Sequence, residues 1–152
     1  METHTNLHKE IDLIQECIKR MASNSFMLKG WTITIFAIVL AISHDTAIKC
    51  TFIMFILLVV IISFWWLDAY FLRLERMYRQ MYAWVLEERL QKGSEKHQYD
   101  LNPERFSKDV DCLCRVVFSA TLRRFYLPLV IVLLLAILWE CRFWICNLIC
   151  QY

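Results

Sequence analysis

The chain has 152 residues, 59% of them hydrophobic, and a formal net charge of +2. Soluble domains are usually about 45–50% apolar, so this composition argues against an ordinary soluble protein. Two glycines and two prolines argue against a fold rich in turns, because turns use both residues heavily. The apolar residues are concentrated in separate blocks, which predict an all-α membrane protein.

Residues 1–25 precede the first apolar block and have the pattern of an amphipathic helix. Apolar side chains recur at spacings of four and three residues, namely at Leu7, Ile11, Ile14, Ile18 and Met21. This spacing is typical of a helix that packs nearly parallel to another helix. We therefore predict a cytoplasmic amphipathic helix over residues 1–25.

Three apolar blocks are candidates for transmembrane helices. A bilayer core of ~30 Å needs about 20 apolar residues, with roughly 17–25 as the range. The blocks 26–43 and 50–67 each contain 18 residues and meet this requirement. The apolar core of the third block reaches the required length only with residues at its ends, as in 125–147. The sequence therefore predicts two to three transmembrane helices.

The entrance to the first block carries polar and amphipathic residues. Ser23, Asn24 and Ser25 are small, and Lys29 and Trp31 follow them. A tryptophan ring is stable at the headgroup level, and a lysine can extend its amine to water. These residues are either an ordinary interfacial anchor or a place where a cation holds an anionic ligand.

Residues 50–92 contain no proline or glycine, so the second span continues as a cytoplasmic extension over 68–92, in a helix ~65 Å long. A polar loop over 93–102 follows. Asn102 and Pro103 resemble an N-cap and a first helical residue, and they predict a helix over 103–124 that leads into the third span. Pro128 is expected to kink that span. We predict a single domain over 1–152, with a cytoplasmic helical bundle and a homo-oligomeric assembly.

The basic residues predict the orientation in the membrane. Eleven lysines and arginines lie in 69–124, whereas the link over 43–49 contains only Lys49. Cytoplasmic segments carry the excess of basic residues, so the N-terminus and 69–124 are expected in the cytoplasm.

The sequence has no pattern typical of an enzyme or a metal site. It lacks a glycine-rich phosphate loop and a GxSxG motif, and Cys112 with Cys114 supplies too few ligands for zinc. We expect no catalytic residues, no cofactor and no metal.

Basic residues are the main candidates for a binding site. Six cations are expected at the inner mouth of the spans: Lys29, Arg73, Arg76, Arg79, Arg123 and Arg124. They are either anchors to anionic headgroups, at ~1 kcal/mol per cation, or a site for the phosphates of a polyanion such as a nucleic acid. Glu75 is placed to pair with Arg79.

Polar residues in the spans are the candidates for a pore and its gate. They are Thr32, Thr34, Thr51, Ser63, Asp68 and, as a hinge, Pro128. Serine and threonine in spans more often bond to their own helix. Asp68 is either a ring carboxylate that favours cations or a simple end-of-span residue.

Two stretches, "IQECIKRMASNSFMLKGW" and "FWWLDAYFLRLERMYRQMY", resemble small bacterial membrane effectors of anti-phage defence. The group includes the channel effector of the Hailong defence system, and the resemblance covers 11–31 and 64–82. It implies a tetrameric ion channel of the bacterial inner membrane that depolarises the cell during infection. It also implies gating from the cytoplasm by a nucleotide or a single-stranded DNA oligomer, and a nucleotidyltransferase-like partner. What it implies for a binding site carries over only to Lys29, Arg73, Arg76 and Arg79, the members of the six cations that lie within the matching stretches.

Two function classes follow from these patterns. The first is an oligomeric pore-forming effector, since two or three helices cannot enclose a water path alone. The second is a membrane-anchoring or assembly subunit that docks a soluble partner.

The orientation gives a first prediction. A reporter inserted at Gly93 should be active only if it works in the cytoplasm, because eleven basic residues surround that position in 69–124. Activity of a periplasm-only reporter at Gly93 would reverse the predicted topology.

Overall fold

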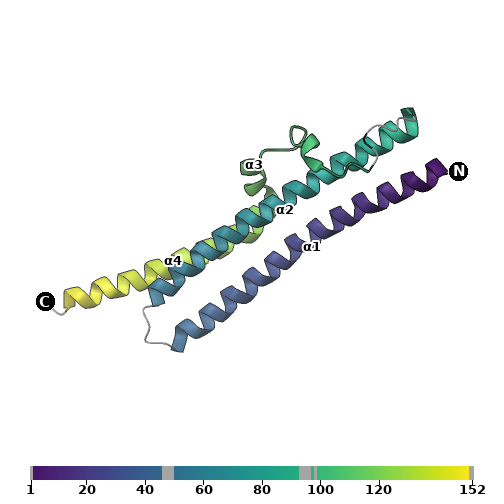
Figure 1. The fold of residues 1–152 in the computed structure, drawn as a ribbon. Coiled ribbons are helices and arrows are strands. Elements are labelled where there is room, and N and C mark those ends of the chain that lie inside the picture. The colour runs from purple at the N-terminus through teal and green to yellow at the C-terminus, as the bar shows by residue number, and fades with distance from the viewer. Residues whose placement is uncertain (1, 46–49, 93–96, 98, 151–152) are drawn as a thin grey trace. The chain divides into compact units, whose positions relative to one another are not determined.

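The computed structural model describes residues 2–45, 50–92, 97 and 99–150. The described chain contains three long helices, α1 (Glu2–Asp45), α2 (Cys50–Lys92) and α4 (Ala120–Cys150). Two short elements lie between α2 and α4: a 3-10 helix, η1 (Pro103–Phe106), and α3 (Leu113–Val117). Figure 1 shows this order, and the described residues form no strand, so the all-α prediction is confirmed.

Three helices are long and apolar enough to cross a membrane, and these are the three blocks that the sequence predicted. Their candidate spans lie within Asn6–Ile42, Phe52–Glu88 and Ala120–Glu140, with mean hydropathies of 1.9, 2.4 and 2.0. The third block therefore reaches the length of a span. Its helix continues through Pro128, which lies inside α4.

The helices α1 and α2 each join a polar segment to an apolar one without interruption. The amphipathic pattern of residues 1–25 and the apolar block 26–43 form one helix. α2 runs from Cys50 to Lys92, the extent expected from the absence of proline and glycine. Its length of 43 residues corresponds to ~65 Å.

The chain forms two compact units, and both α1 and α2 pass from one unit to the other. Unit 1 contains Met1–Met27 and Asp68–Val116, and unit 2 contains Leu28–Leu67 and Val117–Tyr152. The divisions at residues 27/28 and 67/68 lie at the ends of the predicted apolar blocks. Unit 2 thus holds the most apolar parts of α1, α2 and α4.

Unit 1 has a small apolar core between α1, α2 and η1. Ile14, Met81, Val85 and Phe106 are buried and form one cluster. Partly buried side chains pack around it, and these are Leu7, Ile11, Ile18, Tyr78, Tyr82, Trp84 and Leu101. The part of the predicted apolar seam on α1 from Leu7 to Ile18 is therefore confirmed.

The prediction of one continuous helix over 103–124 is wrong. Asn102 does cap a helix, since its Oδ1 accepts a hydrogen bond from the Glu104 N–H at 3.0 Å, but η1 ends at Phe106. Side chains of α2 bind carbonyls that a continuous helix would use. Within unit 1, Arg73 donates to the carbonyls of Ser107 and Asp111.

The same effect occurs within unit 2, at Val117, the last residue of α3. The Trp65 indole N–H donates to the Val117 carbonyl at 3.0 Å. In a continuous helix this carbonyl would accept from the residue four positions later. The Trp65 ring also stacks on Tyr126, which is fully buried, at a centroid distance of 5.7 Å. Large apolar side chains elsewhere in unit 2 are exposed, among them Phe52, Leu135 and Trp139, which suggests insertion into a membrane.

The core of unit 1 generates a stability prediction. Ile14→Ala should lower the free energy of unfolding of unit 1 by about 2–5 kcal/mol, because Ile14 is fully buried in the cluster. The matched control is Leu13→Ala, since Leu13 is 39% exposed on the same helix and should change stability by less than about 1 kcal/mol. Thermal unfolding in detergent measures both, and equal effects would contradict the assigned core.

Candidate functional site

The three arginines on the polar part of α2 lie within unit 1, and each has a partner in the chain. Arg73 donates from Nε to the Asp111 carbonyl at 3.3 Å and from Nη2 to the Ser107 carbonyl at 3.5 Å. Arg76 pairs with the Asp111 carboxylate at 3.2 Å. Arg79 pairs with Glu75 at 2.7 Å, the i,i+4 pair that the sequence predicted.

The Asp111 carboxylate connects α2 to the start of α3. Its second oxygen accepts a hydrogen bond from Arg115 at 2.9 Å. This bond raises the pKa of the exposed Arg115 guanidinium above its ordinary value. A pocket of about 270 Å³ lies beside the pair, lined by Arg76, Arg79, Gln80, Asp109, Val110 and Asp111. Positive and negative side chains both line this pocket, so it is not a purely cationic site.

The other three predicted cations belong to unit 2. Lys29 is half-buried on α1, and Arg123 and Arg124 are exposed in the first turns of α4. The structure therefore groups Arg73, Arg76 and Arg79 within unit 1 and the remaining three within unit 2. The ring of six cations remains a prediction.

Asp68 is the most deeply buried acidic side chain described, with 0% exposure, and it begins the unit 1 part of α2. Ser25, on the unit 1 part of α1, is 8% exposed and donates from Oγ to Asp68 Oδ1 at 2.5 Å. Burying a carboxylate is unfavourable unless hydrogen bonds compensate for its lost hydration. This bond joins α1 to α2 where each helix changes from apolar to polar.

The remaining pore and gate candidates lie in unit 2. The hydroxyls of Thr32, Thr34 and Ser63 donate to the carbonyls of Leu28, Gly30 and Val59, four residues earlier in each case. This is the backbone bonding that is common for such residues in spans. Thr32 is buried, whereas Thr34, Ser63 and Pro128 are exposed. The side chain of Thr51 lies outside the described residues.

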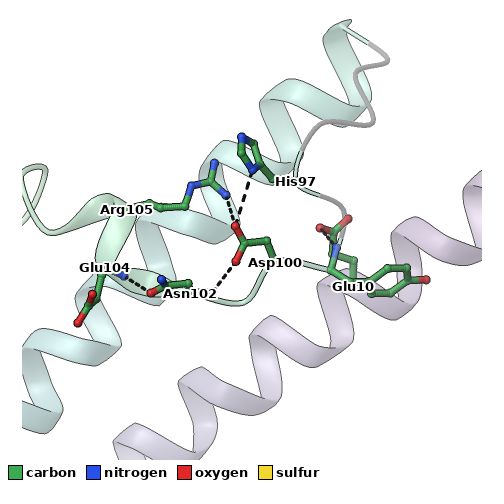
Figure 2. A network of polar contacts seen from close by, with 7 residues as sticks. Glu10, His97, Asp100, Asn102, Glu104 and Arg105 are labelled. Carbon is green, nitrogen blue, oxygen red and sulfur yellow. Dashed lines mark hydrogen bonds and ion pairs between the residues drawn. The ribbon is translucent and has the colours of Figure 1, made fainter.

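The loop that precedes η1 forms a polar network that sequence reasoning missed (Figure 2). Asp100 accepts from Arg105 at 3.1 Å and from the Asn102 N–H at 3.2 Å, and it lies 3.7 Å from His97. The Arg105 guanidinium also stacks over the Trp84 ring at 5.0 Å. These contacts hold the loop on α2.

A second contact of this loop reaches α1. The Tyr99 N–H donates to Glu10 Oε1 at 3.1 Å, and Glu10 is only 2% exposed. His97 and Tyr99 both have positive φ angles, of 58° and 59°, which non-glycine residues adopt rarely. The polar loop could be read from the sequence, but its pairing with a residue 89 positions away could not.

No site for a metal ion is formed by the described residues, which contain no group of three or more His, Cys, Asp and Glu side chains close enough to bind one. Cys17, Cys112 and Cys114 are free thiols.

No protein-family model matches the sequence, and searches of curated proteins and of solved structures found no significant match. The resemblance to defence effectors therefore rests on the two sequence stretches alone.

The contact between Glu10 and Tyr99 can be tested directly. Glu10→Ala removes the acceptor of the Tyr99 N–H, so exchange of that amide with solvent should accelerate roughly tenfold. Glu10→Gln keeps an oxygen acceptor and should change the rate less than about threefold. Hydrogen exchange in detergent micelles measures both rates, and equal rates in the two variants would contradict the contact.

Proposed function

We propose that the chain is a subunit of an oligomeric membrane channel whose closed state is held by the hydrogen bond between Ser25 and Asp68. The observation that supports this proposal is the complete burial of Asp68 at the end of the apolar part of α2. Ionisable residues at such depth are costly and are usually functional.

The burial of Asp68 means that separation of α1 and α2 at this level would change the hydration of its carboxylate. In the joined state the carboxylate has lost its hydration and accepts from Ser25. In a separated state water would reach the carboxylate, and this gain in hydration would offset the lost hydrogen bond. A hydrated Asp68 repeated around a symmetry axis would favour cations in the water path.

Oligomerisation is part of the proposal, because one chain leaves its apolar helices largely uncovered. In the most apolar windows of α1, α2 and α4, 6%, 28% and 17% of the residues are buried. The exposed remainder must contact lipid or other copies of the chain. Three helices cannot enclose a water path between them, so conduction requires several subunits.

The biological setting in this proposal comes from the resemblance. On this basis we propose that the chain is an effector of bacterial anti-phage defence and that it depolarises the inner membrane. The proposal includes assembly as a tetramer and a nucleotidyltransferase-like partner. It also adds gating by a nucleotide or a single-stranded DNA oligomer. Such a polyanion at Arg76 or Arg79 would have to compete with the carboxylates of Asp111 and Glu75.

A second candidate function is that of an anchoring or assembly subunit that docks a soluble partner. The feature that favours it is unit 1, which extends α1 and α2 beyond the apolar blocks and has its own core. This unit exposes charged side chains on α1, including Lys9, Asp12 and Lys19. An anchoring subunit would conduct no ions in a purified membrane.

Ion flux through liposomes that contain the purified protein separates the two functions. Ser25→Ala removes the donor to buried Asp68, which destabilises the closed state and should raise cation leak roughly tenfold. Asp68→Asn removes the carboxylate and should lower the preference for cations over anions. The control is Ser63→Ala. The exposed Ser63 hydroxyl donates to the Val59 carbonyl of its own helix, so its removal should not change the ion flux.

Two outcomes would contradict this proposal, the first for the channel itself and the second for its gating. The first is a wild-type protein that is monomeric by mass in detergent and conducts no ions, which would favour the anchoring function. The second is a leak that rises equally in Ser25→Ala and Ser63→Ala, which would remove the Ser25–Asp68 bond from gating.

A further inference from the structure

The segment 107–112, between η1 and α3, is attached to α2 in an unusual way. Phe106 before it and Val116 after it are buried, at 8% and 0% exposure. Between these two apolar anchors, Lys108, Asp109 and Cys112 are exposed. The described polar contacts between this segment and α2 come from two arginines, Arg73 and Arg76.

These contacts are weak by their geometry and their exposure. The two bonds from Arg73 are 3.3 and 3.5 Å long, at or beyond the usual upper limit for N–H···O bonds. The Arg76 and Asp111 side chains are 36% and 38% exposed, so water and salt screen their attraction. The polar pocket of about 270 Å³ beside them means that the segment is not closely packed on α2 there.

The same arginine contacts occupy the atoms that a helix would need. A helix through 107–112 requires the Ser107 carbonyl to accept from the Asp111 N–H and the Asp111 carbonyl to accept from the Arg115 N–H. Arg73 binds both carbonyls instead, and the Arg115 N–H donates to the Cys112 carbonyl at 3.0 Å. The turn and the helix therefore differ in the donors that these two carbonyls receive, and the Arg73 contacts stabilise the turn.

The residues on either side of this segment carry signals for a helix that would run through it. Asn102 caps the start, Pro103 occupies the first position, and Leu101 packs against the cluster that contains Phe106. Apolar residues continue at Val110, Leu113 and Val117 with helical spacing. Local signals for a helix that are opposed by tertiary contacts reduce the free-energy difference between the turn and the helix.

We propose that 107–112 is a conformational switch between two states. One is the turn described here, which Arg73 and Arg76 hold against α2, and the other is a helix that joins η1 to α3. Arg73 and Arg76 hold the turn, and loss of the Asp111 contact releases it. The segment precedes α4, which starts at Ala120, so its conversion to helix would shorten the connection to that helix. This inference does not depend on ion conduction.

The test is hydrogen exchange of the amides of 109–112 in the full-length protein in detergent micelles. Arg73→Ala removes both contacts that hold the turn, so these amides should become helical and exchange roughly tenfold more slowly. Asp111→Asn loses the ion pair with Arg76 and should slow exchange in the same direction. The ¹³Cα shift of Val110 should move toward helical values in both variants.

Two matched control variants test whether the effect is specific to the contacts of Arg73 and Arg76 with the segment 107–112. Arg79→Ala removes the third arginine of this part of α2. The described partner of Arg79 is Glu75, which lies on α2 itself and not on the segment 107–112. Arg115→Ala removes the partner of Asp111 that lies on α3 and leaves the Arg76 pair in place. Neither control should slow exchange in 109–112.

Removing a contact that holds a loop normally accelerates the exchange of its amides. The slower exchange predicted for Arg73→Ala is therefore diagnostic of helix formation. Faster exchange in Arg73→Ala, with no helical shift at Val110, would mean that the arginines only tether a loop, and the proposal would be wrong. Unchanged exchange in both Arg73→Ala and Asp111→Asn would also overturn it. A circular dichroism spectrum that retains the wild-type helix content guards against general unfolding.

Discussion

The uninterrupted helix α2 is the constraint on which the other contacts depend. Because no proline or glycine occurs between Cys50 and Lys92, one continuous helix carries both an apolar and a polar segment. Side chains along α2 contact the segments beside it. Trp65 donates to the last residue of α3, Asp68 binds α1, Arg73 binds the segment before α3, and Trp84 packs under Arg105 of η1.

Two of these contacts share one physical principle, which is the capture of a backbone carbonyl by a side chain of α2. A helix gains one hydrogen bond per residue once it is nucleated, so a side chain that takes a carbonyl must compete with that gain. Trp65 succeeds at Val117, where a stacked Tyr126 and an edge-on Phe118 fix the indole ring. Arg73 has no aromatic contact among those described for it and reaches its carbonyls at longer distances. The break at Val117 is therefore the firmer of the two.

Much of the fold could be predicted from the sequence, because long helices are determined by local composition. The extent of α2, the continuity of α1 and the third apolar helix all follow from patterns within a few turns. The cap at Asn102 and the pair of Glu75 with Arg79 are equally local and were predicted. The helix over 103–124 failed because Arg73 and Trp65 act on it from 34 to 52 residues away, and single-sequence patterns contain no information on such pairs.

The same limit applies to the candidate site. The sequence identified Asp68 and the arginines as unusual, since charges beside an apolar block stand out. It gave no sign that Ser25 would donate to Asp68, or that Asp111 would occupy Arg76. An arginine stripe reads as a free cationic surface until its partners are known, and here those partners belong to the chain itself. The charges of α2 thus act first on the fold, and any ligand of these arginines must share them with a partner in the chain or replace it.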